Sequence, residues 1–440
     1  MEYFEVEGGH KLNGEILPQG AKNEALQILS AVVLTDKPII VKNVPEILDV
    51  LRLIDILKKL GVEVEKKGEG EFCFVAKTIN EEYLSSKEYL KDAASLRGSI
   101  MLVGALLSRL GYAIMPKPGG DKIGRRRLDT HFLGIQKLGA YFYYDNDNQI
   151  YKVSTHQSLQ GNYILLDEAS VTGTANIILA SVFAKGITTI FNAACEPYVQ
   201  QLCKMLVNMG AKIEGIGSNL LHIHGVSSLN GTSHTIQSDM IEIGSFIAMA
   251  AMTQSHLTIL NAYPNQLGII PDIFQKLGVK LQLENDKIIV PEQDIYEIET
   301  FIDGSILTVS DHTWPGFTPD LISVALVMAT QAKGTVLIHQ KMFESRLFFV
   351  DKLIDMGAQI ILCDPHRATV IGLGRSHSLK GISMTSPDIR AGVAMLIAAM
   401  SAQGTSKIYN IEQIDRGYMK IDERLNALGA KIIRKVSSVS

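Results

Sequence analysis

A basic, glycine-rich segment is the first part of this chain that could do chemistry. Residues 117–131 read KPGGDKIGRRRLDTH, with glycines, Asp121 and three consecutive arginines close together. Glycine allows a loop to adopt unusual backbone conformations, and guanidinium groups bind phosphate or carboxylate through paired hydrogen bonds. A carboxyl group among them could donate a proton to a bound anion or accept one from it. The segment is therefore either a loop that grips an anionic ligand or a solvated surface turn.

Polar and charged residues also stand at the starts of several apolar segments that we expect to be helices. They are Lys22, Asn23, Arg97, Ser170, Asp239, Asp320, Asp388 and Arg390. Serine and aspartate are ordinary caps at such positions, and we expect that role for Asp239. A cation is different, because the helix dipole disfavours it there by roughly several tenths of a kcal/mol. Lys22, Arg97 and Arg390 therefore predict a compensating anion, which favours a bound phosphate or carboxylate.

Sequence motifs for nucleotides, metals and disulfides are absent. No G-x-x-x-x-G-K-[ST] occurs, and GLGRSH at residues 372–377 lacks the third glycine of a dinucleotide fingerprint. His131 and His339 lack metal-ligand spacing, and we interpret them as structural or solvated. The sequence predicts neither a metal nor a cofactor. The cysteines form no C-x-x-C pair, so we expect free thiols at Cys73, Cys195, Cys203 and Cys363.

The composition is that of a globular protein with more than one domain. Of the 440 residues, 46% are hydrophobic and 20% are charged, and this length predicts about two or three domains. The net charge of -4 argues against a nucleic-acid partner, which would require a basic face. The N-terminal stretch MEYFEVEGGHKL lacks the features of a signal peptide. No apolar run reaches the roughly 18 residues of a membrane span, so we expect a cytoplasmic protein without a membrane partner.

A short tag recurs six times along the chain: leucine or methionine, then glycine, then alanine or valine. Its spacing of about 70 to 80 residues indicates six similar units that account for nearly the whole chain. In each unit we expect an apolar helix, a strand, an amphipathic helix that ends at the tag, and a further strand. The glycines of the tags are Gly61, Gly139, Gly210, Gly278, Gly357 and Gly429.

The first helix of each unit is apolar almost all round. Examples are NEALQILSAVVL at residues 23–34 and IGSFIAMAAM at residues 243–252. Such helices are buried on every side, which predicts an α/β fold with helices inside and sheets partly outside. Solenoid packing is the alternative, although units of this length are long for a solenoid.

Three stretches, together with the sixfold repeat, resemble the enolpyruvyl transferases. They are GAKNEAL at residues 20–26, PGGDKIGRRRLD at residues 118–129 and IDRGY at residues 414–418. The resemblance runs from about residue 3 to residue 435 and implies a two-domain inside-out α/β barrel with three repeats per domain. It implies one domain at residues 22–234, with the catalytic loop at 117–131, and another at residues 1–21 plus 235–440. Three glycine tags fall in each of these halves, which agrees with that division.

Within the family, the resemblance is stronger to the branch that acts on UDP-N-acetylglucosamine. It implies transfer of the enolpyruvyl group of phosphoenolpyruvate to the sugar 3′-hydroxyl, the first committed step of peptidoglycan synthesis, without a cofactor. The branch that acts on shikimate 3-phosphate typically has Ser-Lys-Ser where this chain has Ala21-Lys22-Asn23, and it lacks the long basic loop. Shikimate 3-phosphate transfer stays an alternative, as does a non-catalytic protein that binds a sugar nucleotide.

The resemblance assigns roles to individual residues of this chain. Phosphoenolpyruvate would be held by Lys22, with Asn23 beside it, and by Arg126 and Arg416. Asp320 would be the base for the hydroxyl proton, and Asp121 the acid for C3 of phosphoenolpyruvate. Charged residues that complete the site would be Arg346, Asp388 and Arg390. The UDP-sugar would be held by Arg97, Arg126, Arg127, Leu128, Asp129, Thr130, Ser170, Val171 and Met342.

Four positions depart from the usual family pattern, and one of them is Ala175, where a glutamate is common. Asp121 stands where most familiar members have a cysteine, so we expect an active enzyme that the epoxide antibiotic fosfomycin does not inactivate. Arg127 stands where proline is usual. Glu168 falls where some members have a lysine near the diphosphate, and a carboxylate there would repel that group. We therefore expect the chain near Glu168 to contribute backbone groups rather than this side chain.

Overall fold

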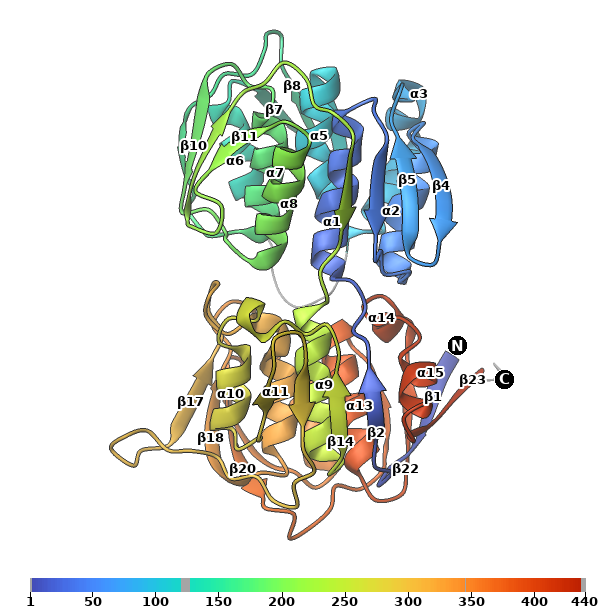
Figure 1. The fold of residues 1–440 in the computed structure, drawn as a ribbon, viewed down its shortest axis with the longest axis vertical. Helices are drawn as coiled ribbons and strands as arrows, with labels where there is room; N and C mark the ends of the chain where they lie inside the picture. Colours follow the sequence, from blue (N-terminus) through green and yellow to red (C-terminus); the bar gives the residue numbers. More distant parts are fainter. Residues whose placement is uncertain (1, 120–126, 345, 437–440) are drawn as a thin grey trace. The chain divides into compact units, whose positions relative to one another are not determined.

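The computed structural model describes residues 2–119, 127–344 and 346–436. These residues form two compact units, shown in Figure 1. Unit A comprises residues 20–119 and 127–237, and unit B comprises residues 2–19 together with the described part of 238–440. Each unit contains three of the six glycine tags. The expected domain boundaries at residues 22 and 234 stay a proposal, to which we return below.

The first helices of the repeats lie at the centre of each unit and contact one another. Every side chain of α9 and α11 is buried, as their apolar sequences predict. Figure 1 shows sheets around these helices within each unit, which confirms the expected inside-out arrangement. In unit A the helices are α1 (Lys22–Ala31), α5 (Leu102–Leu110) and α7 (Val171–Ser181). In unit B they are α9 (Met240–Met252), α11 (Ile322–Ala329) and α13 (Ile389–Ser401). Short 3-10 turns adjoin three of them: η1 (Val32–Leu34), η2 (Arg97–Met101) and η4 (Pro319–Leu321).

The second helices end at the glycine tags, and the backbone explains why the tag recurs. All six tag glycines have positive φ, between 91° at Gly61 and 111° at Gly429. Glycine adopts this left-handed conformation without the steric cost that a Cβ atom brings, so it terminates helices readily. The helices are α2 (Leu48–Lys59), α6 (Asp129–Lys137), α8 (Pro197–Asn208), α10 (Ile270–Lys276), α12 (Val350–Asp355) and α15 (Ile421–Asn426).

Five of the sheets have four strands arranged in the same order. The outer strand pairs in parallel with its neighbour, and the remaining pairs are antiparallel. Side chains alternate between the two faces, so that Val336 and Ile338 are buried while their neighbours are partly exposed. The two sheets of unit A are β13 (Thr232–Thr235), β3 (Ile39–Lys42), β5 (Glu71–Val75), β4 (Glu63–Gly68); and β9 (Tyr163–Leu165), β10 (Ile187–Phe191), β12 (Leu220–His224), β11 (Lys212–Glu214). The three of unit B are β2 (Asn13–Ile16), β14 (His256–Ile259), β16 (Ile288–Val290), β15 (Gln282–Leu283); β17 (Leu307–Ser310), β18 (Lys333–His339), β20 (Arg367–Leu373), β19 (Gln359–Asp364); and β21 (Ser383–Thr385), β22 (Thr405–Tyr409), β1 (Glu2–Glu7), β23 (Lys431–Val436).

The sixth sheet has three strands among the described residues, in the order β6 (Tyr112–Pro116), β8 (Ile150–Ser154), β7 (Tyr141–Asp145). In the position of the missing outer strand, ahead of the repeat's first helix, the chain forms α3 (Glu81–Leu84) and α4 (Lys87–Ala94). Helix α4 packs against β6, which leads directly into the basic segment. The backbone N–H of Gly119 donates to the carbonyl of Ala94 at 2.8 Å, so α4 anchors the entrance to that segment.

Helix length and composition were also compared with the requirements of a membrane span. In the described part of the chain, no single helix is long and apolar enough to cross a bilayer. One pair of helices at residues 87–94 and 97–110 would qualify by length and composition, and it is bent by 117°.

Candidate functional site

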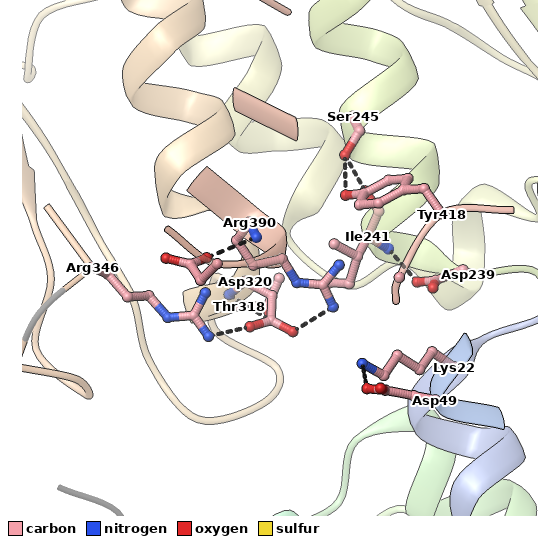
Figure 2. A network of polar contacts seen from close by, with 12 residues as sticks. Lys22, Asp49, Asp239, Ile241, Ser245, Thr318, Asp320, Arg346, Arg390 and Tyr418 are labelled. Atoms are coloured by element: carbon pink, nitrogen blue, oxygen red, sulfur yellow. Dashed lines mark hydrogen bonds and ion pairs between the residues drawn. The ribbon is translucent and has the colours of Figure 1, made fainter. Parts of the chain in front are cut away.

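Lys22 is the first residue of α1, and its side chain is almost fully buried. The ammonium group donates a hydrogen bond to Oδ2 of Asp49, on α2, at 2.5 Å. Figure 2 shows this pair beside the start of α1. The exposed fractions are 8% for Lys22 and 2% for Asp49. A buried cation requires a nearby negative charge, and a carboxylate of the protein provides it here.

The start of α1 is held by a second carboxylate, Glu24. Its Oε2 accepts the backbone N–H of Gln237 at 3.2 Å, and its Oε1 lies 2.8 Å from Nε2 of His234. Glu24 is fully buried, and it is acidic in the first turn, where the helix dipole favours a negative charge. These contacts fix the backbone that carries Lys22 and Asn23.

A second charged group, in unit B, centres on Asp320. Arg346 donates from Nη2 to Oδ1 of Asp320 at 2.6 Å, and Arg390 donates from Nη2 to Oδ2 at 2.9 Å (Figure 2). Both arginines are nearly buried, with 5% and 6% of their surfaces exposed, whereas the Asp320 side chain is 18% exposed. Two guanidinium groups therefore face one carboxylate, which leaves this group of three with a surplus of positive charge.

Helix capping positions the members of this group. Asp388 is the N-cap of α13 and accepts the backbone N–H groups of Arg390 at 2.8 Å and Ala391 at 3.0 Å. The guanidinium of Arg390 also lies over the ring of Tyr418, 5.9 Å from its centroid. Burial alone would lower the pKa of Arg390, but Asp320 and the other acidic groups raise it above its usual range. Arg390 therefore stays charged.

Arg346 has more hydrogen-bonding capacity than its described surroundings use. Its Nε and Nη1 atoms are buried and have no partner among the described residues. Its guanidinium stacks on Phe343, 4.8 Å from the ring centroid, which fixes the plane of the fork. Buried N–H groups nearly always have an acceptor, so an anionic ligand fits this position.

The residues expected to hold the UDP-sugar in unit A lie at the starts of α6 and α7 and in η2. Arg127 pairs with Asp129 at 2.9 Å on the surface, and Leu128 is buried. Thr130 donates to Asp167 at 2.7 Å. Helix starts present free N–H groups and the positive end of the helix dipole, which suits a diphosphate. Arg97 begins η2, and α7 begins at Val171 with Ser170 as its N-cap.

Glu168 lies close to two other carboxylates, those of Asp167 and Asp129. Burial and the neighbouring Asp167 raise the pKa of the Glu168 carboxyl, which makes the neutral form easier to reach. The carbonyl of Glu168 accepts the N–H of Ser170 at 2.8 Å and shapes the turn before α7.

The remaining expected residues of unit B are on two other segments. Met342 is 41% exposed, and its backbone N–H donates to the buried Asp311 at 3.1 Å. Arg416 is 8% exposed and donates to Oε1 of Gln413 at 2.9 Å.

The structure corrects one argument from the sequence. The sequence predicts a ligand anion at each of these helix starts, but the protein itself supplies Asp49 to Lys22, and it supplies Asp320 to Arg390, which shares this carboxylate with Arg346. Sequence reasoning missed Asp49, although a signal existed, because Asp49 shares the buried face of α2 with Leu53 and Ile56 at helical spacing. Asp388, which the resemblance places among the charged residues of the site, is the N-cap of α13, and its role toward a ligand stays a prediction.

Two expected residues, Asp121 and Arg126, lie outside the described residues. Asp239 is the N-cap of α9, as expected, and accepts the N–H of Ile241 at 2.9 Å. Among the described residues, no three His, Cys, Asp or Glu side chains are grouped as metal ligands would be.

Comparisons with known proteins place these features in a family. The family model of EPSP synthase (3-phosphoshikimate 1-carboxyvinyltransferase) matches residues 6–425. The likeness to solved structures shows the shared fold: enolpyruvyl transferase NikO from Streptomyces tendae has a TM-score of 0.86 at 21% identity and covers 99% of each chain. EPSP synthase from Acinetobacter baumannii has a TM-score of 0.71 at 18% identity and covers 99% of this chain and 100% of its own.

Curated relatives are far more similar in sequence. A UDP-N-acetylglucosamine 1-carboxyvinyltransferase of Bacteroides thetaiotaomicron is 64% identical, over 99% of this chain and 100% of the relative. The protein of the same name from Porphyromonas gingivalis is 63% identical with the same coverage, and that from Treponema denticola is 49% identical over 98% of this chain and 99% of the relative. With identities of this size over its whole length, the chain belongs to the UDP-N-acetylglucosamine 1-carboxyvinyltransferase family of enolpyruvyl transferases.

Proposed function

We propose that this chain transfers the enolpyruvyl group of phosphoenolpyruvate to the 3′-hydroxyl of UDP-N-acetylglucosamine and releases phosphate. The observation that carries the proposal is the 64% identity, over 434 residues, to a relative named for this reaction. Both substrates are highly charged metabolites that do not cross a bilayer unaided. We therefore place the reaction in the cytoplasm, as the first committed step of peptidoglycan synthesis.

The addition step requires an acid and a base. The 3′-oxygen attacks C2 of phosphoenolpyruvate while C3 takes up a proton, which gives a tetrahedral adduct. We assign Asp320 as the base that receives the hydroxyl proton. The support is its position: its carboxylate is partly exposed, and two arginines hold it in place. We assign Asp121 as the acid for C3, on its place in the basic segment.

The elimination step reverses the proton transfer at C3. C3 loses a proton, the double bond to C2 re-forms, and the C2–O bond to phosphate breaks, which leaves an enolpyruvyl ether. Cations must stabilise the departing phosphate, and we assign this role to Lys22, Arg126 and Arg416. The surplus positive charge around Arg346 and Arg390 supports an anionic ligand in unit B.

We further propose that the two compact units are the two domains expected from the sequence. UDP-N-acetylglucosamine would be bound by Arg97, Arg126–Thr130, Ser170, Val171 and Met342. The support in unit A is the gathering of helix starts, whose N–H groups suit a diphosphate. The exposed carboxylate of Asp129 and that of Glu168 oppose an anion, so backbone groups of these turns would carry the contact.

A single assay tests the reaction against its alternatives. Phosphate release from phosphoenolpyruvate should require UDP-N-acetylglucosamine and should not occur with shikimate 3-phosphate. Release with shikimate 3-phosphate alone would establish the other branch, and release with neither acceptor would indicate a binding protein without catalysis. The Ser-Lys-Ser difference at Ala21-Lys22-Asn23 favours the first outcome.

The role of Asp121 has its own test. A carboxylic acid can protonate C3, but it cannot form the thioether that fosfomycin forms with a cysteine. We expect Asp121→Asn to lose activity by roughly 10²–10⁴-fold, because a general acid contributes about that much. We expect Asp121→Cys to become sensitive to fosfomycin while the native chain keeps its activity. Covalent mass gain on Asp121 in the native chain, with loss of activity, would contradict this assignment.

A further inference from the structure

We propose that His131 is a positioning residue, which joins α6 to α7 and holds the Asn176 side chain that joins α7 to η2; these three segments of unit A carry the residues proposed to bind the UDP-sugar. The inference rests on the proposed function, because those segments were assigned through it. His131 is on α6, directly after Thr130, and nothing in the proposed chemistry uses it. Its ring is bonded twice to α7, through Thr172 and Asn176, and Asn176 in turn is bonded to η2.

The hydrogen bonds around Asn176, on α7, define this connection. Oδ1 of Asn176 accepts the backbone N–H of Gly104 at 2.6 Å. Its amide nitrogen is therefore the donor, and it reaches the carbonyl of Ile100 at 3.0 Å and Nδ1 of His131 at 3.0 Å. Since Nδ1 accepts a hydrogen bond, the ring proton of the neutral imidazole must be on Nε2. Nε2–H then donates to Oγ1 of Thr172, which lies 3.2 Å away.

The bonds of the ring and of Asn176 reach segments that carry residues expected to bind the UDP-sugar. Thr172 follows Val171 at the start of α7, and Ile100 is in the 3-10 turn that begins at Arg97. His131 follows Thr130, and its backbone N–H donates to Leu128 at 3.1 Å. The ring thus fixes the start of α6 against α7, and Asn176, which the ring holds through Nδ1, fixes α7 against η2.

The environment keeps the ring neutral and fixed. His131 is 2% exposed, and Asn176 is fully buried. Burial, together with the positive charge of Arg97, lowers the pKa of His131 to about 3. A neutral ring with both nitrogens partnered has one orientation, which is the property that a positioning group requires.

Close packing explains why these helices associate but not how they are aligned. A Cβ atom on Gly104 would lie 2.1 Å from the backbone oxygen of Asn176, and one on Gly134 would lie 2.2 Å from Cδ1 of Ile177. The glycines therefore allow α5, α6 and α7 to approach closely. Apolar contacts of this kind tolerate small shifts along the helix axis, whereas a bond to each ring nitrogen does not.

The test compares variants of the full chain in two measurements: the Kd for UDP-N-acetylglucosamine by calorimetry, and the KM for each substrate. Thr172→Val removes the acceptor of Nε2–H at constant shape, and His131→Leu removes both ring contacts. His131→Gln retains a donor near the Nε2 position. Ser181→Ala is the control, because Ser181 is equally buried on α7 but bonds only within its helix, to Ile177 at 2.6 Å.

We expect Thr172→Val to raise the Kd and KM for UDP-N-acetylglucosamine about fivefold, which corresponds to one ordinary hydrogen bond. His131→Leu should raise them further, and His131→Gln should recover part of the loss. The KM for phosphoenolpyruvate and the effect of Ser181→Ala should both stay within about twofold, the usual range for sites that do not share partners.

Two results would overturn the inference. In the first, native chain binds UDP-N-acetylglucosamine and releases phosphate, but folded Thr172→Val and His131→Leu have unchanged Kd and KM values. In the second, the Thr172 and His131 variants lose affinity for both substrates equally, and this loss follows the loss of unfolding free energy. Ser181→Ala would behave in the same way if packing alone determined the affinity. If the native chain neither binds UDP-N-acetylglucosamine nor releases phosphate, the proposed function itself fails and the inference fails with it.

Discussion

The two buried charged groups of this protein, Lys22 with Asp49 and Asp320 with its two arginines, differ in their ratio of positive to negative side chains. In unit A, the buried ammonium of Lys22 is paired with the carboxylate of Asp49, so this pair has one charge of each sign. In unit B, Asp320 is held between Arg346 and Arg390, so positive charge is in excess. An anion that binds Lys22 must compete with Asp49, whereas an anion that binds near Asp320 complements charge that is already unbalanced. We therefore expect an anionic ligand to bind beside Arg346 and Arg390 without displacing a carboxylate, and to bind Lys22 only in competition with Asp49.

The largest expected effect is on catalysis in unit B. Asp320→Asn should lower kcat by roughly 10²–10⁴-fold, because it removes the proposed base while the amide retains the shape. Phosphate release under saturating substrates measures this. Asp355→Asn, an exposed carboxylate with a lysine partner on α12, is the control and should have native kcat. Equal activity of the two variants would remove Asp320 from the base role.

The next effect tests whether unit A is self-balanced. Asp49→Asn leaves the buried ammonium of Lys22 without its charged partner, and breaking such a pair costs about 3 kcal/mol of unfolding free energy. Chemical denaturation measures the loss. Phosphate or phosphoenolpyruvate should then raise the Tm of Asp49→Asn by more than that of the native chain, since the ligand replaces the missing carboxylate. If Asp49→Asn has the same unfolding free energy as the native chain, the charge of Asp49 is not what compensates the buried ammonium of Lys22.

Acid should destabilise unit A through a buried neutral histidine that belongs to neither charged group, His131. The pKa of His131 is lowered to about 3 by burial and by Arg97. Between pH 6.5 and 3 the unfolded chain binds a proton that the folded chain does not, so stability falls as pH falls, by up to about 1.4 kcal/mol per unit.

Carboxylates also contribute to acid unfolding, so the variant His131→Gln isolates the histidine. Its unfolding free energy should depend less steeply on pH than that of the native chain below pH 6.5, and equally above it. Parallel curves for the two proteins throughout this range would show that His131 titrates normally in the folded state.

The smallest expected effect separates charge from geometry in unit B. Arg390→Lys preserves the excess charge but loses the guanidinium fork, so the KM for phosphoenolpyruvate should rise only about fivefold, the equivalent of one hydrogen bond. Arg390→Met removes the excess charge and should raise this KM further. If Arg390→Lys and Arg390→Met have the same KM, the positive surplus is not what attracts the anion.

Local features of the fold were predictable from the sequence, and contacts between distant residues were not. The glycine tags and the apolar first helices depend on left-handed backbone and on periodicity, which neighbouring residues determine. The pairing of Asp320 with Arg390, 70 positions apart, depends on how whole repeats pack. The family resemblance supplied the names of these residues but not their partners. Thus His131 was interpreted as merely structural or solvated, and the bonds of its ring emerged only from the structure.

Because α4 stands in the place of an edge strand, the basic segment at residues 117–131 depends on a helix that the described residues of the other repeats lack. Repeats built on one pattern leave each copy free to change while the others maintain the core. The copy that carries residues 117–131 has exchanged its outer strand for a helix, and the carbonyl of Ala94 at the end of that helix holds Gly119. A Cβ atom on Gly119 would lie 2.4 Å from this oxygen, so the contact between Ala94 and Gly119 requires a glycine at position 119. Moving this segment into another repeat, by design or by recombination, would require moving residues 81–94 with it.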